Sequence, residues 1–352
     1  MNRDILISKL EHYGTISRTN KLIKSYLSNW YQRVIIKSSH ALNYPSAWEL
    51  VKHGAPLGSI LGPLLFLFYI NDLPQLVKDI AVPVLFADDT SFLIANSNSG
   101  NKNQELKLVL DITQKWFKSN ILLLNYDKTT FMQFSSNISC KSPVNPQSID
   151  SKINFTNSTK FLGIIIESSL TWRKHIDYIN SELHFLGYIL HSLRSVLLKI
   201  IKQVYTSYVH SILNYGIIFW GNSSYFRTIF ITQKRIVRII MKAKARDSCR
   251  EMFSKLGILT LYSQYIFSTL MVVIRHKDIF TVNKELHKIN MHHKLDLHVP
   301  LTNLTKVQKG VYYSGVTLFN SLLFGIKEVA NNTNEFKHEL KNFLFKKPVL
   351  FS

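Results

Sequence analysis

The sequence has few cysteines and no long apolar run, and each shortage excludes a class of protein. Its 352 residues include only 2 cysteines, which excludes a disulfide framework or a cysteine-rich zinc site and suits a reducing compartment. The longest apolar run, Ile60–Ile70, is too short to span a bilayer. The N-terminal segment lacks the apolar core and cleavage site of a secretory signal. We therefore expect an intracellular protein, in the nucleus or the cytoplasm, that is not secreted.

Acidic residues are also scarce, because 22 Asp and Glu stand against 43 Lys and Arg, for a formal net charge of +21. A surplus of this size favours a polyanionic partner, with nucleic acid first and an anionic membrane surface second. No stretch combines the basic and amphipathic character that membrane-surface binding requires, so we expect no membrane partner. A soluble basic protein, or a piece of a larger chain, is the alternative explanation of the charge. Hydrophobic residues make up 46% of the chain, which predicts a folded core.

Strand and helix patterns are mixed in the first 170 residues. Residues 3 to 37 show helical spacing, although Gln32–Ser38 within them is typical of a strand. The polar stretch His40–Glu49 is expected to be a loop, and Ser158–Glu167 a single strand that contains a glycine.

After Leu170 the pattern is nearly all helical as far as about Met252. One apolar stripe is formed by Ile176, Ile179, Leu183, Leu186, Leu190 and Leu193, and a second by Leu197, Ile201, Val204, Tyr208 and Ile212. A mixed half, a helical module and a third small region together predict an α+β fold.

The stretch VLFADDTSFLI, residues 84 to 94, places Asp88 and Asp89 between two short strands that read as buried. Asp is common at hairpin tips, which would explain either acid alone. Two adjacent carboxylates between apolar strands are costly unless they are paired, and Mg²⁺ is the natural partner. Because neighbouring residues of an extended chain point in different directions, Asp88 is expected to ligate directly and Asp89 less directly.

Four motifs in a fixed order extend this interpretation. GAPLGSILGP is followed by FADD, LNYDKT and KFLG, and later stretches such as LNYGIIFWG and RIVRII complete the pattern. This order resembles the reverse transcriptase of non-LTR (LINE-like) retrotransposons, particularly the jockey-like elements, over essentially the whole chain. The resemblance implies part of a right-hand polymerase palm, an antiparallel sheet with packed helices, in residues 1–170. It also implies an α-helical thumb in residues 171–260 and a mixed C-terminal extension in residues 261–352.

The resemblance further implies which residues form the site. Asp88 and Asp89 would hold Mg²⁺, two ions in the complete family site, and Lys128 would lie near the phosphates of the nucleotide. Template and nucleotide would be bound by Gly54, Pro56, Gly58, Ser59, Phe86 and Ala87, and the primer end by Phe161, Leu162 and Gly163. The nucleic-acid backbone would be contacted by four basic residues, Lys234, Arg235, Arg238 and Lys242. Three of them, Lys234, Arg238 and Lys242, recur every four residues, so we expect these three to share a helical face.

Two departures from the family pattern affect the expected activity. Leu57 stands where the family has a glutamine in the template and nucleotide pocket. The opening MNRDIL resembles the segment that follows the strand carrying the family's first catalytic aspartate, so that strand is expected to be absent here, and Asp4 aligns with a non-catalytic position. Paired metal ions about 3.5 to 4 Å apart need carboxylates that bridge them.

The resemblance therefore predicts RNA-directed DNA synthesis by two-metal nucleotidyl transfer, using an RNA template, a DNA primer and dNTPs, with little activity in this chain alone. The alternative is a non-enzymatic, basic nucleic-acid-binding remnant of a retroelement.

Overall fold

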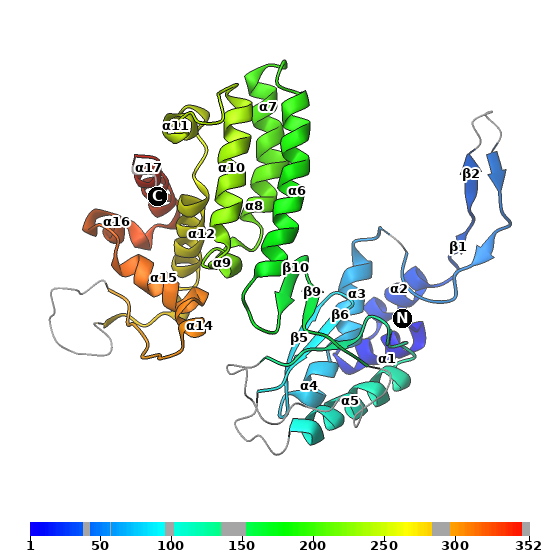
Figure 1. Cartoon of the computed structure of the whole chain (residues 1–352). Coiled ribbons are helices and arrows are strands. Elements are labelled where there is room, and N and C mark those ends of the chain that lie inside the picture. Colours follow the sequence, from blue (N-terminus) through cyan, green and yellow to red (C-terminus); the bar gives the residue numbers. More distant parts are fainter. Residues whose placement is uncertain (38–42, 57, 96–101, 135–152, 284–295, 347–352) are drawn as a thin grey trace. The chain divides into compact units, whose positions relative to one another are not determined.

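The computed structural model describes residues 1–352 except 38–42, 57, 96–101, 135–152, 284–295 and 347–352. The chain divides into two compact units, Met1–Thr156 (unit 1) and Asn157–Ser352 (unit 2). Both contain helices, and the described strands form pairs (Figure 1), so the fold is mixed helix and sheet as predicted. The boundary lies 14 residues before the one expected at residue 170, and the three-domain division stays a prediction.

Helices provide the core of unit 1. They are α1 (Arg3–His12), α2 (Arg18–Leu27), α3 (Leu61–Ile70), α4 (Leu73–Val77) and α5 (Lys102–Ser119). Leu6, Leu10 and Tyr69 are fully buried in this core. The Lys9 ammonium ties α1 to the α3–α4 segment, because its Nζ donates to the Tyr69 carbonyl at 2.6 Å and lies 2.8 Å from an Asp72 oxygen.

The described strands of unit 1 occur in pairs and not in one continuous sheet. They are β1 (Tyr31–Gln32) with β4 (Glu49–Leu50), β2 (Ile35–Lys37) with β3 (Asn43–Pro45), β5 (Val82–Phe86) with β6 (Asp89–Leu93), and the parallel pair β7 (Thr130–Phe131) and β8 (Asn154–Phe155). The loop predicted over His40–Glu49 is therefore wrong in part, because β3 and the start of β4 fall within it. The backbone of Asn43–Pro45 and of Glu49 pairs with the strands that precede this stretch, which the residue types alone did not indicate.

The β5–β6 hairpin has one buried and one exposed face. Leu85 and Phe92 pack on the core of unit 1. On the opposite face Val82 and Phe86 are each 60% exposed, and Leu93 is 53% exposed. The expectation of buried strands on both sides of the acids is therefore wrong for one face, since no described element of unit 1 covers it.

Unit 2 begins with a hairpin and continues as helices. Its elements include β9 (Ser158–Phe161), β10 (Ile164–Glu167), α6 (Arg173–Ser192), α7 (Leu198–Val204), α8 (Ser211–Asn214), α9 (Ile217–Trp220), α10 (Phe226–Ile240) and α11 (Arg250–Leu256). The single strand predicted over Ser158–Glu167 is wrong, because Leu162 and Gly163 turn the chain back on itself. The first apolar stripe is confirmed, since α6 buries Ile176, Ile179, Leu183, Leu186 and Leu190.

The second apolar stripe does not follow the predicted period. A π-helical turn, Tyr205–His210, interrupts the helix between α7 and α8. Tyr205 and Val209 of this wider turn are buried, and they continue a spacing of four residues with the buried Ile201 of α7, Leu213 of α8 and Ile217 of α9. Of the predicted members, Ile201 is buried and Val204 and Ile212 are partly buried against the same core. Leu197 and Tyr208 are instead exposed.

A second core cluster of unit 2 surrounds α12 (Leu261–Arg275), which packs against α10, α15 (Val311–Asn320) and α17 (Thr333–Lys346). Shorter elements are α14 (Thr305–Gln308), α16 (Phe324–Glu328) and two 3₁₀ turns, Lys277–Ile279 and Val329–Asn331. In the described part of the chain no single helix has the length and apolar composition to cross a membrane. The helices α11 and α12 have that length and composition only when taken together, and they are bent by 54° where they meet.

His175 of α6 is buried, and we expect it to make the stability of unit 2 depend on pH. It is 2% exposed, its Nδ1 accepts a long hydrogen bond of 3.4 Å from the Ile165 backbone N–H, and its Nε2 has no partner in the structure. Desolvation lowers the pKa of His175 below its ordinary 6.5, and burial with the charge of Lys341 also lowers the pKa of His210. As the pH falls below 6.5, these histidines therefore bind protons in the unfolded chain more readily than in the folded chain, which lowers the free energy of unfolding.

We expect His175→Phe to reduce the loss of stability on acidification. Between about pH 7.5 and about pH 5.5 the wild-type free energy of unfolding should fall by up to about 1.4 kcal/mol through His175 alone. Urea denaturation followed by circular dichroism at both pH values measures the difference. His210 remains in both proteins, so the variant should keep a smaller acid dependence, and an unchanged one would contradict this role of His175.

Candidate active site and nucleic-acid interface

The turn between β5 and β6 presents both acids of the Phe-Ala-Asp-Asp motif to solvent. Phe86 pairs with Asp89 across the hairpin, so Ala87 and Asp88 form a two-residue loop. Ala87 has φ +50°, and a positive φ at the first loop position is the pattern of a type II′ turn, which normally takes glycine. Holding alanine in this region costs free energy, and such strain is concentrated at functional sites. The structure therefore supports a specialised turn and not an ordinary polar tip.

The two carboxylates are free to bind an external partner. Asp88 and Asp89 are both exposed, and no described cation forms an ion pair with either of them. Exposed carboxylate oxygens suit Mg²⁺, which keeps several waters and bridges to phosphates. Within the described residues no third His, Cys, Asp or Glu joins them in a metal-binding group. The donors therefore fit one ion in kind, while a bridged pair of ions needs further ligands.

The glycine-rich stretch before α3 forms a turn that the N-terminus holds in place. Gly54 and Gly58 have φ +82° and +77°, a region that glycine adopts without strain. The Gly54 N–H donates to the Met1 carbonyl at 2.9 Å, and Arg3 Nε donates to the Gly54 carbonyl at 3.2 Å. This arrangement fixes the loop against α1.

Ser59 and Pro56 shape the beginning of α3. The Ser59 N–H donates to the Pro56 carbonyl at 3.2 Å, and the Ser59 hydroxyl accepts from the Gly62 N–H at 3.1 Å. Ser59 therefore has a structural contact of its own besides its predicted role. Leu57 lies outside the described residues.

Lys128 lies in an exposed turn of unit 1. Its backbone N–H donates to the Asn125 side chain at 3.2 Å, and the Thr129 N–H donates to the Asn125 carbonyl at 3.0 Å. Asn125 thus forms the turn, and the Lys128 side chain is left exposed. Its predicted place beside nucleotide phosphates stays a prediction.

The predicted primer-binding residues form the tight turn between β9 and β10 in unit 2. Leu162 and Gly163 have φ +45° and +82°, which is the type I′ pattern of a two-residue hairpin. The Tyr215 hydroxyl donates to the Leu162 carbonyl, and a Cβ at Gly163 would meet Tyr215 Cε1 at 3.3 Å. Tyr215 therefore supports the turn. The sequence did not predict this role, because Tyr215 lies 53 residues after Leu162.

The basic residues of α10 do not form the single row that their spacing predicted. Lys234 lies over the Phe230 ring at 4.8 Å, and Arg238 Nε donates to the Asp247 carbonyl at 2.9 Å, so both are half-buried against unit 2. Lys242 lies beyond the end of α10 with φ +55°, outside the helical face. Arg235 and Lys242 are exposed.

A second candidate interface, which the sequence analysis missed, is the outer face of α6. We define it by its exposed residues Lys174, Tyr178, Phe185 and Tyr188. Phe185 is 63% and Tyr188 71% exposed, and Lys160 of β9 lies 5.4 Å from the Tyr178 ring centre. Exposed aromatic rings beside cations are suited to contact with nucleic-acid bases and phosphates. The sequence could have indicated this face, because its aromatic residues fall on the side of the helix opposite the apolar stripe.

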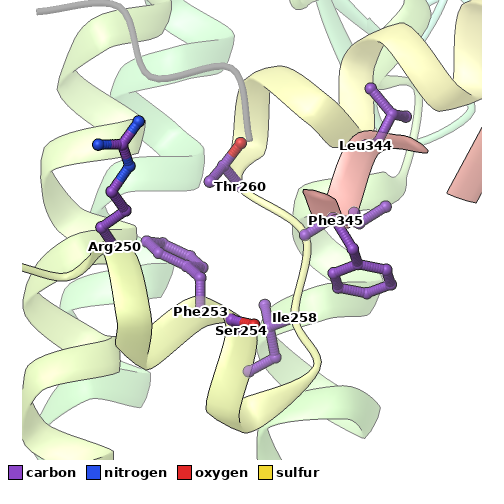
Figure 2. Close-up of a pocket in the computed structure, with 8 residues that line it drawn as sticks. Arg250, Phe253, Ser254, Ile258, Thr260, Leu344 and Phe345 are labelled. Carbon is purple, nitrogen blue, oxygen red and sulfur yellow. The ribbon is translucent and has the colours of Figure 1, made fainter. Parts of the chain in front are cut away.

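A pocket in unit 2 has no room for a nucleotide. It lies between α11, the following loop and α17, and is lined by Arg250, Phe253, Ser254, Ile258, Leu259, Thr260, Leu344 and Phe345 (Figure 2). Its volume of about 10 Å³ admits roughly one water molecule. This pocket therefore offers no site for chemistry on a nucleotide.

Comparison with known proteins places these features in one family. A family model described as reverse transcriptase (RNA-dependent DNA polymerase) matches residues 1–190. The chain is 28% identical over 251 residues to "Probable RNA-directed DNA polymerase from transposon BS" of Drosophila melanogaster, which covers 65% of the chain and 27% of that protein. It is 25% identical over 232 residues to "RNA-directed DNA polymerase from mobile element jockey" of the same species, covering 61% and 25%.

A third relative, "Retrovirus-related Pol polyprotein from type-1 retrotransposable element R1" of Bradysia coprophila, is 26% identical over 209 residues, covering 57% of the chain and 20% of that protein. The chain thus spans about a quarter of the length of these relatives. No solved structure matches it. With more than half of its residues matched by the family model, the chain belongs to the reverse transcriptase (RNA-dependent DNA polymerase) family, as a relative of the polymerases of jockey-like non-LTR retrotransposons.

Proposed function

We propose that this chain is the palm- and thumb-bearing part of an RNA-directed DNA polymerase, which extends a DNA primer along an RNA template with dNTPs. The observation that carries the proposal is the exposed Asp88–Asp89 pair on a strained two-residue turn. An acidic pair held in this way at a hairpin tip, in a chain of this family, is suited to metal-assisted phosphoryl transfer. Unit 1 would supply the palm, and the helices from α6 to α10 the thumb.

Each group has a distinct role in this proposal. Asp88 and Asp89 would hold Mg²⁺, which, when bound, offsets the negative charge that develops on the transferred phosphoryl group. The Gly54 loop, held by Met1 and Arg3, would present its backbone to the template base and nucleotide, and Lys128 would lie close to the phosphates. The Leu162–Gly163 turn, supported by Tyr215, would hold the primer end.

Among the residues that the structure describes, Asp88 and Asp89 alone would be too few for a two-ion mechanism. Two adjacent carboxylates on one turn cannot bridge two ions about 3.5 to 4 Å apart and also complete their coordination. The structure brings no third acidic residue to them within its described ranges. We therefore propose that the chain alone synthesises little DNA and needs a further carboxylate from another polypeptide segment.

Nucleic-acid contact would be made mainly by unit 2. The outer face of α6 offers aromatic rings and Lys174, and Arg235 and Lys242 provide exposed charge near α10. Because phosphate contacts need no base readout, these surfaces are suited to bind a template–primer duplex of any sequence.

Primer extension on an RNA template, with Mg²⁺ and labelled dNTPs, tests the proposal. We expect the purified chain to bind the template–primer but to incorporate no more label than the Asp88→Asn/Asp89→Asn variant, with equal binding by both proteins. Robust synthesis that the double variant abolishes would confirm the polymerase and refute the incomplete site. Absence of binding would refute the polymerase assignment.

The second candidate function is a basic nucleic-acid-binding protein without catalysis, which the net charge of +21 favours. Its distinguishing result is a wild-type chain that stays inactive when a relative's upstream polymerase segment is added in trans. Restored synthesis that depends on Asp88 would support the polymerase instead.

A further inference from the structure

The β9–β10 hairpin of unit 2 depends on its neighbours for its position. In the described part of the chain its two strands, of four residues each, form a sheet by themselves. An isolated hairpin of this size is at best marginally stable in water. The position of its turn, Leu162–Gly163, is therefore set by contacts with the helices of unit 2. Figure 1 shows the hairpin at the end of the helical bundle where α6 begins.

Tyr215, in the connection between α8 and α9, contacts the turn with both its hydroxyl and its ring. The hydroxyl donates to the Leu162 carbonyl. The ring lies against the backbone of Gly163, where a Cβ would be 3.3 Å from Tyr215 Cε1. Leu162 and Gly163 lie between the paired residues Phe161 and Ile164, so strand pairing does not replace either contact.

The two residues that follow the turn are also held from outside the hairpin. A Cβ at Gly216 would be 2.5 Å from Ile164 Cδ1, so the lack of a side chain there lets β10 approach the α8–α9 connection. The Ile165 N–H donates to His175 Nδ1 at 3.4 Å, which links β10 to α6. Each of the four residues 162 to 165 is thus held by a residue of the helical bundle.

Trp220 connects these supports to the core of unit 2. Its Nε1 donates to the Tyr215 carbonyl at 3.0 Å, and its ring centre lies 6.1 Å from that of His175. Trp220 is completely buried, whereas Tyr215 is 53% exposed and Gly163 is exposed. The close-packed core therefore determines where Tyr215 lies, and Tyr215 determines where the exposed turn lies.

We propose that Tyr215 is a positioning residue for the primer, which acts by fixing the turn that meets the primer's 3′ end. Its role rests on the proposed function, in which the Leu162–Gly163 turn holds that end. The turn presents backbone and no charge, so it does not supply the general attraction that Lys and Arg exert on every phosphate. Tyr215 should therefore affect the selectivity for a primer end and not the affinity for a duplex.

Binding and photocross-linking with the full chain test this inference. Two RNA–DNA hybrids of equal paired length are compared, one with a recessed DNA 3′ end on a longer RNA and one with blunt ends. A 4-thiothymidine at the DNA 3′ terminus reports which peptide it contacts. We expect the wild type to prefer the recessed end and to cross-link within residues 158–167. Tyr215→Phe keeps the ring and removes one hydrogen bond, so it should lower the preference and the cross-link yield about fivefold, with unchanged affinity for the blunt hybrid.

Hydrogen exchange of the free protein is the second measurement, and it needs no nucleic acid. The amides of residues 158–167 should exchange faster in Tyr215→Phe than in the wild type. The matched control is Tyr208→Phe, which removes a hydroxyl from a residue that is 58% exposed on the π-helical turn. Tyr208 is none of the residues that hold the hairpin, so this variant should match the wild type in exchange, preference and cross-linking.

The possible failures can be told apart. Wild-type preference and cross-linking in Tyr215→Phe would overturn the role of Tyr215 while the proposed function stands. An equal fall in Tyr208→Phe would overturn it too, because the effect would not be specific to the turn. Cross-links of the wild type that fall only outside residues 158–167 would show that the turn does not meet the primer end. Absence of binding to both hybrids would refute the polymerase assignment itself, and this role with it.

Discussion

Raising the salt concentration from about 50 mM to about 200 mM is expected to weaken the binding of an RNA–DNA duplex to this chain about a thousandfold. The reason is the net charge of +21, because a protein that contacts six or more phosphates displaces a similar number of condensed cations, and salt opposes their release. Fluorescence anisotropy of a labelled duplex, measured at four salt concentrations, gives the slope of log affinity against log salt.

The variant Arg235→Ala/Lys242→Ala separates local contact from overall charge in this measurement. If both exposed residues contact phosphates, the slope should fall by about two and the affinity should drop for every sequence tested. The control Lys337→Ala/Lys346→Ala removes the same charge from exposed positions on α17, and should keep the wild-type slope. Identical slopes for the two variants would remove Arg235 and Lys242 from the interface.

Replacement of Trp220 by alanine is expected to destabilise unit 2 by about 4 kcal/mol. Trp220 is completely buried, its ring lies against His175 and Phe226, and its Nε1 donates to the Tyr215 carbonyl at 3.0 Å. The change leaves both a large cavity and an unpaired carbonyl. Hydrogen exchange read by mass spectrometry should show faster exchange through the buried faces of α6 and α10, with unit 1 unchanged.

Phe219 provides the matched control at the neighbouring position. It is 47% exposed and stacks on Trp172 with ring centres 6.5 Å apart, so Phe219→Ala should cost less than about 1 kcal/mol. An effect of Phe219→Ala as large as that of Trp220→Ala would mean that the aromatic surface, and not the buried core, sustains this end of unit 2.

The two apolar stripes show how far periodicity predicts helix packing. On α6 an unbroken helix keeps the 3.6-residue period, so the sequence predicts its buried face correctly. The next stripe fails at Tyr208, because the π-helical turn widens the repeat to four residues. Nothing local marks that turn, since it is stabilised by the buried contacts of Tyr205 and Val209 with the rest of the core.

The sequence predicts where the candidate site lies better than it predicts the backbone conformation and the contacts of its residues. The Phe-Ala-Asp-Asp motif predicts the hairpin and its acids, and both are present as expected. The positive φ of Ala87 and the support of Leu162 by Tyr215 depend on contacts that a single motif does not encode. The α10 row was misjudged for a similar reason, because charge spacing does not reveal that Lys234 and Arg238 pack within unit 2.

The open apolar face of the β5–β6 hairpin has a practical consequence for handling the protein. An exposed apolar surface beside Asp89 is formed by Val82, Val84, Phe86 and Leu93. Unpaired strand edges next to such a surface favour aggregation. In dilute buffer the mutual repulsion of highly cationic molecules opposes this. Concentrated salt screens that repulsion, so we expect the recovery of the protein to fall when it is held at high salt.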